Sequence, residues 1–141
     1  MLAAANDQQV IYWELSTMMP VRKNYASLGE VTAPYVHAVS HNQTLYVSGL
    51  TAFGTPANQG DIAAQAEVIF DQLESIAAAE NTSLQQLIKV TLFVTSFKDI
   101  DALRNVLFKR YGDYLPASAL VQVSALFSPD LLIEIDAILG L

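Results

Sequence analysis

Apolar residues recur at steps of three and four in two stretches of the chain, the spacing of one face of an α-helix. Asp61 precedes the first stretch and is a residue type that caps helix N-termini. Gly112 follows the second, where a C-terminal cap belongs. The apolar positions are Ile62, Ala66, Ile69, Phe70, Leu73, Ile76 and Ala77, then Ile100, Leu103, Leu107 and Tyr111. The spacing predicts a helix over about 61–80 and a second one ending near residue 111.

Other segments carry the alternation or the β-branched content of strands. They cover residues 35–40, 44–50, 90–95, 118–126 and 131–139. The first two flank the turn His41-Asn42-Gln43 and predict a β-hairpin. Ser83 opens a Ser-x-x-Gln capping box, which predicts one short helical turn.

The last two strands predict a sheet with two different faces, because side chains alternate along a strand. One face carries Leu131, Ile133, Ile135, Ala137 and Leu139, together with Ala119, Val121, Val123 and Ala125. The other carries Leu132, Glu134, Asp136 and Ile138, together with Ser118, Leu120, Gln122 and Ser124. The apolar first face is suited to pack against the two helices. The second face is too apolar to be fully exposed to water and too polar to form a hydrophobic core within one subunit. We therefore expect an α+β fold with both helices on one face and an oligomer built on the other.

Length and composition favour one folded domain. The chain has 141 residues, of which 52% are hydrophobic and 15% charged, so it buries enough apolar surface to fold. Residues 1–32 predict an N-terminal arm, because residues 10–13 suggest only a short strand and residues 16–33 show no clear period. Residues 33–141 form the predicted single domain.

The charge and the residue types exclude several classes of protein. The net charge is −7 and basic residues are scattered, which disfavours nucleic-acid binding. The chain has no cysteine, so it has no thiolate nucleophile, disulfide or zinc-thiolate site. No segment has the length of a membrane span or the pattern of a signal peptide. We expect a cytoplasmic protein without a cofactor, a nucleic-acid partner or a membrane partner.

Several motifs in this order resemble the RidA/YjgF family, also called the L-PSP family. They are Ala33-Pro34-Tyr35, Leu45-Tyr46-Val47-Ser48-Gly49, Gly60-Asp61-Ile62 with Gln65, Val90-Thr91-Leu92-Phe93-Val94, Pro116-Ala117 and Ile133-Glu134-Ile135. The resemblance spans residues 33–139 and implies a chorismate-mutase-like fold, a mixed six-stranded sheet backed by two helices. It also implies a homotrimeric barrel with ligand clefts between subunits. Active members hydrolyse reactive imines and enamines, such as 2-aminoacrylate, to 2-oxo acids and ammonia.

The chain departs from this family at residue 118. Active members read Pro-Ala-Arg-Ser, and this chain reads Pro116-Ala117-Ser118-Ala119. The family arginine binds the substrate carboxylate, and a guanidinium fork does so bidentately, whereas a serine hydroxyl brings one neutral donor. Leu50 stands where the family often has glutamine, which makes the pocket more apolar. These departures predict weak or no deaminase activity.

The resemblance implies roles for two charged residues, each with a plainer alternative. Glu134 matches the glutamate that orients or activates the attacking water, and it is otherwise a polar residue on the wet face of a strand. Asp136 lies about 7 Å along the same face, at ~3.3 Å per residue. Arg104 matches a position near the cleft and could supply the missing positive charge. Its alternative is a solvated surface arginine.

Uncharged residues complete the candidate site. Tyr35 either lines the cleft or packs, and Ser48 either binds a ligand carboxylate or satisfies a strand end. Gly49 and Leu50 follow Ser48 in the same ligand-binding segment. Ser118 contacts the ligand through its position, without a base to make it a nucleophile. His37 and His41 would lie ~13 Å apart on a strand, which argues against a shared metal site.

Three functions remain open at this point. The first is a trimeric module that binds a small, less charged metabolite, and it follows from Ser118 and Leu50. The second is an imine or enamine hydrolase that uses Glu134, with Arg104 or backbone donors for the substrate carboxylate. The third is ribonuclease activity, a label attached to the family, against which the acidic charge argues.

Overall fold

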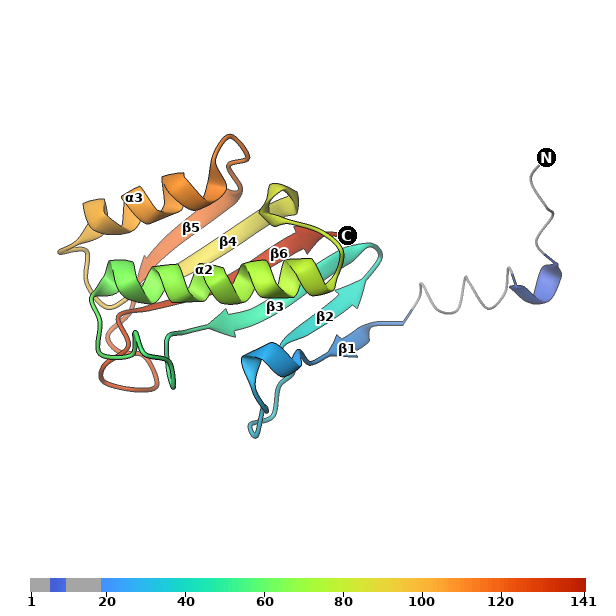
Figure 1. Ribbon diagram of the computed structural model, residues 1–141, viewed down its shortest axis with the longest axis horizontal. Helices are drawn as coiled ribbons and strands as arrows, with labels where there is room; N and C mark the ends of the chain where they lie inside the picture. The colour runs from blue at the N-terminus through green and yellow to red at the C-terminus, as the bar shows by residue number, and fades with distance from the viewer. Residues whose placement is uncertain (1–5, 10–18) are drawn as a thin grey trace.

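The computed structural model describes residues 6–9 and 19–141 and shows a six-stranded sheet backed by helices (Figure 1). The elements are β1 (Val21–Lys23), η1 (Ala26–Leu28), β2 (Ala38–His41), β3 (Thr44–Leu50), α2 (Ile62–Ala79), η2 (Leu84–Gln86), β4 (Leu87–Val94), α3 (Ile100–Tyr111), β5 (Ala117–Gln122) and β6 (Ile133–Gly140). The strand order is β1-β2-β3-β6-β4-β5, with β4 and β5 parallel and the other neighbours antiparallel. The predicted mixed sheet is confirmed.

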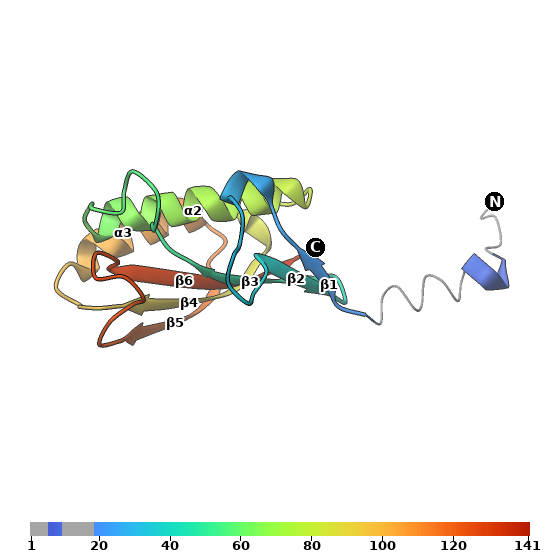
Figure 2. The ribbon, with the colours of Figure 1, turned by 90° about the horizontal axis from the view of Figure 1, so that it is seen from below.

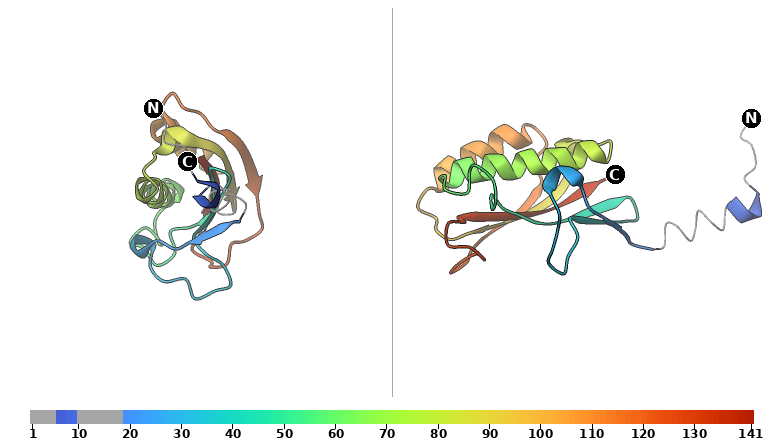
Figure 3. Two further views of the ribbon diagram at one scale, coloured as in Figure 1. Left: turned by 90° about the vertical axis from the view of Figure 1, so that its right-hand side faces the viewer. Right: turned by 60° about the horizontal axis from the view of Figure 1, so that its bottom comes forward.

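Helices α2 and α3 both lie on one face of the sheet (Figure 2). Among the described residues no helix covers the opposite face, which we call the bare face (Figure 3). Asp61 caps α2, because its Oδ1 accepts a hydrogen bond of 2.8 Å from the Ala64 N–H. Gly112 ends α3 with φ 58°, and its N–H donates to the Phe108 carbonyl. Both predicted helices are therefore confirmed, with the caps that the sequence indicated.

The alternation along β6 places its apolar residues in the core. Ile133, Ile135, Ala137 and Leu139 are buried. Glu134 and Asp136 lie on the other face, opposite Phe93 and Thr91 of β4. The predicted two-faced character of this strand is confirmed.

The predicted faces of the strand at 118–126 are wrong. Its partner β4 buries Val90 and Leu92, and these residues are in register with Ser118 and Leu120. Since residues in register share a face, Ser118 and Leu120 lie on the helix side and Ala119 on the bare side. Both faces of this edge strand carry apolar residues, so alternation alone did not indicate which face meets the helices. The strand also ends at Gln122 rather than near residue 126.

Residues 19–32, part of the predicted arm, contribute to the fold. Strand β1 pairs with β2, and Tyr25 is buried in the core cluster. Glu80, after the end of α2, accepts hydrogen bonds from Lys23 Nζ at 2.7 Å and from the Tyr25 hydroxyl at 2.8 Å. This part of the chain is therefore fastened to sheet and helix. The short strand predicted at residues 10–13 lies outside the described residues.

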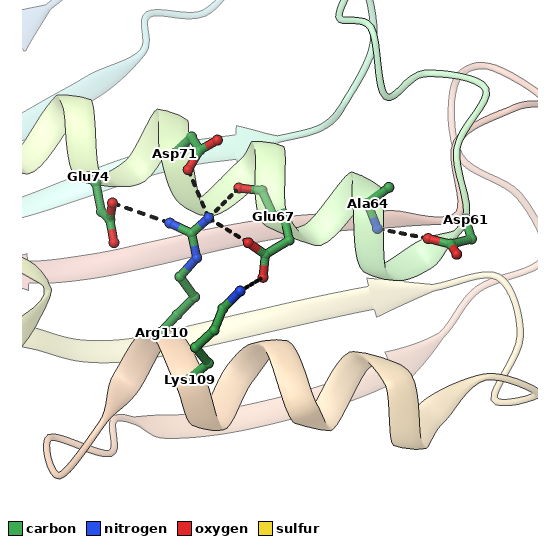
Figure 4. A network of polar contacts seen from close by, with 7 residues as sticks. All are labelled: Asp61, Ala64, Glu67, Asp71, Glu74, Lys109 and Arg110. Carbon is green, nitrogen blue, oxygen red and sulfur yellow. Dashed lines mark hydrogen bonds and ion pairs between the residues drawn. The ribbon is translucent and has the colours of Figure 1, made fainter.

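A network of ion pairs joins α3 to α2 (Figure 4). The Arg110 guanidinium lies 2.8 Å from carboxylate oxygens of Glu67 and Asp71, and 3.2 Å from Glu74. Lys109 Nζ lies 2.8 Å from the second oxygen of Glu67. The Arg110 side chain is only 13% exposed. These contacts hold the two helices side by side over the sheet.

Candidate functional site

A β-bulge interrupts the pairing of β3 with β6 beside the candidate site. Val47 pairs with Ala137 and Leu50 with Ile135, so β3 has one more residue than β6 between these pairs. The bulge contains Ser48 and Gly49. The Ser48 N–H donates to the His37 carbonyl at 2.9 Å, and its hydroxyl donates to the Val36 carbonyl at 2.6 Å. Ser48 thus links the bulge to the segment that precedes β2, and its hydroxyl proton is already engaged.

The Glu134 carboxylate lies over the bulge. A β-carbon on residue 49 would overlap Glu134 Oε1, so the close approach requires glycine. Burial raises the pKa of Glu134, and the charge of Asp136 raises it further. Within the described residues, no protein group donates a hydrogen bond to this carboxylate. Glu134 is therefore a partly desolvated carboxylate without a donor in the described part of the chain.

A pocket of about 680 Å³ opens above Glu134. Its lining includes five of the predicted site residues, Tyr35, Ser48, Gly49, Leu50 and Glu134. They come from the loop before β2, from the end of β3 and from β6, segments that are distant in the sequence. The fold thus brings most of the predicted site together.

Ser118 and Arg104 lie elsewhere, in a smaller hollow of about 230 Å³ between α3 and the start of β5. Arg104 is 59% exposed in its side chain and lies 3.5 Å from Asp101, one turn away on the same helix. This geometry fits the solvated alternative for Arg104. Within one chain, Ser118 and Glu134 therefore do not share a pocket.

Two phenylalanines at the Glu134 pocket are missing from the predicted site. Phe53 and Phe127 lie on separate loops and meet edge to face, with ring centroids 4.8 Å apart. They are 55% and 68% exposed, which is unusual for large apolar side chains. Neither belongs to a periodic segment, so the sequence offered no signal that would place them at Glu134.

The charged groups of this pocket are acidic. Glu30 and Glu134 line it, and among the described residues that line it there is no lysine or arginine. His37 also contributes, but its Nδ1 accepts a hydrogen bond from the Tyr25 N–H at 2.9 Å. Burial lowers the pKa of His37 and so favours the neutral ring. Among the described residues of one chain, this pocket offers an anionic ligand no positive side chain.

Comparison with known proteins identifies the family. The family model described as "Endoribonuclease L-PSP" matches residues 27–139. The chain belongs to this family. The match confirms the RidA/YjgF resemblance and begins six residues before the motifs on which that resemblance rested.

Relatives and solved structures agree with this membership. The yeast protein "Protein MMF1, mitochondrial" from Saccharomyces cerevisiae is 32% identical over 128 residues, which is 88% of this chain and 86% of that protein. A protein named 2-iminobutanoate/2-iminopropanoate deaminase, from Dermatophagoides farinae, is 27% identical over 96 residues, 66% of this chain and 75% of its own length. The crystal structure of RidA from an Antarctic Psychrobacter species superposes with a TM-score of 0.72 at 30% identity, covering 79% of this chain and 92% of the other.

In the described part of the chain, no helix is both long enough and apolar enough to span a membrane.

Proposed function

We propose that this RidA-like protein forms a homotrimer and binds a small metabolite in clefts between subunits, with weak or no imine deaminase activity. The bare sheet face supports the assembly, because Tyr46 and Val121 lie on it and are 49% and 41% exposed. A neighbouring copy would cover such apolar surface. It would also bring the Ser118 hollow of one subunit to the Glu134 pocket of another.

The observation that carries the proposal is the lack of a carboxylate anchor. Residue 118 is serine, and no lysine or arginine is among the described residues that line the Glu134 pocket. A charge-assisted hydrogen bond contributes about 1.5–3 kcal/mol, so loss of a bidentate pair lowers the rate by several powers of ten. Without this anchor, an imino acid binds weakly, because its carboxylate is repelled by Glu30 and Glu134.

We further propose that the protein is located in the cytoplasm and that neither nucleic acids nor membranes are its partners. The net charge of −7 supports the exclusion, since RNA and anionic lipid surfaces repel an acidic protein. No cofactor enters the proposed function.

The test is ammonia release from freshly generated 2-aminoacrylate, combined with the mass of the assembly from light scattering. We expect a trimer whose wild-type rate stays at background. Ser118→Arg should then gain activity, whereas Ser118→Gln, of similar length and without charge, should not. A wild-type rate well above background that disappears in Glu134→Ala would contradict the proposal.

Hydrolysis of an imine or enamine is the second candidate, favoured by the named deaminase among the relatives. Glu134 would orient water, and Arg104 of a neighbouring subunit or backbone donors would hold the carboxylate. In that case Arg104→Gln should raise KM more than it lowers kcat, because a binding group is lost.

Ribonuclease activity is the last candidate and rests on the family description. A salt-dependent shift of RNA in a gel at micromolar protein would support it. We expect none, given the acidic charge.

A further inference from the structure

We propose that the Glu134 pocket binds a small organic amine as its ammonium ion, with an apolar body against Phe53 and Phe127. This inference rests on the proposed binding function and names the ligand class of the same site. It reverses the ligand charge expected for an imino acid.

The charges of the pocket favour a cation. Glu30 and Glu134 are the acidic groups that line it, and no lysine or arginine among the described residues lines it beside them. His37 adds no charge, because its Nδ1 holds the Tyr25 N–H and burial favours the neutral ring. Arg104 lines the Ser118 hollow that a neighbouring subunit would bring, but it lies 3.5 Å from Asp101 of its own helix, which offsets its charge. Within one subunit an anionic ligand would face two carboxylates, whereas an ammonium ion is attracted by both.

Glu134 specifically needs a donor. Its carboxylate is half-buried over Gly49, and within the described residues no protein group donates to it. An ammonium group has three N–H donors and a positive charge, so one ligand group meets both needs. The hydroxyl of Ser48 does not serve, because it already donates to the Val36 carbonyl.

The aromatic wall favours an apolar body next to that charge. Phe53 and Phe127 meet edge to face and are each more than half exposed, so their outer surfaces remain open to a ligand. Aromatic faces attract cations as well as apolar groups. Tyr35 is 55% exposed and lines the same pocket. A volume of about 680 Å³ accommodates a molecule of ten or so heavy atoms.

The experiment uses isothermal titration calorimetry to compare the binding of three probes of similar shape to the full-length protein. They are 2-phenylethylamine (cation), 2-phenylethanol (neutral) and 3-phenylpropanoate (anion). We expect saturable binding of the amine, at least tenfold weaker binding of the alcohol and no binding of the anion. Preferential binding of the anion, or equal binding of all three, would overturn the inference, and so would no binding of the amine.

Variants locate the contact. Glu134→Gln should reduce the preference for the amine over the alcohol, with Glu30 retaining the remainder, and the surface control Asp113→Asn should leave the preference unchanged. Phe127→Ala should weaken the binding of the amine and of the alcohol by similar factors, because it removes the apolar contact that both ligands share. An unchanged preference in Glu134→Gln, with the fold retained by circular dichroism, would contradict the assignment.

The outcomes separate this inference from the proposed function. If the anion binds and the amine does not, the inference fails while a binding module without deaminase activity stands. If the amine binds and the wild type also hydrolyses 2-aminoacrylate through Glu134, the inference stands and the proposed function fails.

Discussion

The Glu134 carboxylate lies so close to Gly49 that it occupies the space where a β-carbon of residue 49 would be. The bulge in β3 produces this contact, because the extra residue shifts the backbone of Gly49 beneath the side chain from β6. The position of the carboxylate in the pocket therefore depends on a residue that carries no side chain.

Gly49→Ala should displace Glu134 and leave the fold intact. The new methyl group meets the end of a flexible side chain, which can rotate away at a cost on the order of 1 kcal/mol. We expect amine binding to fall at least tenfold while the circular dichroism spectrum is unchanged. The double variant Gly49→Ala/Glu134→Ala should recover the lost stability without recovering binding. Full binding by Gly49→Ala would show that the carboxylate does not depend on this contact.

Glu134→Gln should stabilise the free protein at neutral pH. Burial, and then the Asp136 charge, raise the folded-state pKa of Glu134, so the folded state binds this proton more tightly than the unfolded state. Stability from this group is thus fully present at low pH and is lost as pH rises through the raised pKa. Urea unfolding should show a gain for the variant at pH 7 that vanishes below about pH 4. A constant difference between the two proteins across this range would contradict the shift.

Arg110 and Lys109 provide a matched pair of cations on α3. Arg110 is 13% exposed and contacts carboxylates of Glu67, Asp71 and Glu74, whereas Lys109 is 65% exposed and contacts Glu67 alone. Arg110→Gln should lower the free energy of unfolding by about 2 kcal/mol, because it leaves several carboxylates without their cation. Lys109→Gln should lower it by about 0.5 kcal/mol, as for exposed pairs. If urea titrations gave the same loss of unfolding free energy for both variants, the burial of Arg110 would not explain a larger contribution from this residue.

Glu80 should anchor β1 in a pH-dependent way. Burial alone would raise its pKa, but hydrogen bonds from Lys23 and Tyr25 outweigh burial, and the folded-state pKa is lowered. Stability from this group is therefore present above its ordinary pKa and is lost as pH falls through the lowered value. Glu80→Gln should speed amide exchange in β1 at pH 7, and the difference from wild type should shrink in acid. If Glu80→Gln speeds amide exchange only in strands other than β1, this anchoring role is contradicted.

The sequence alone determined the two long helices, the family, and the existence of five of the six strands in the sheet, β1 being the one it missed. Asp61 and Gly112 cap helices where the apolar spacing begins and ends, because capping and periodicity are local properties of the chain. The alternation through Ile133 and Ile135 correctly indicated the buried face of β6. Tyr35, Ser48 and Glu134 were also named from short motifs, and they do line one pocket.

The tertiary structure decided what depends on register and on contacts between distant segments. Alternation in residues 118–122 could not show that Ser118 lies on the helix side, because that face follows from pairing with β4. The chain by itself gave no sign that Phe53 and Phe127 meet beside Glu134, since both lie on loops without a period. The acidic sign of the pocket has the same origin, because Glu30 reaches it from a segment whose path no local pattern predicts. Local patterns encode elements, and the chemistry of this site arises where separate elements meet.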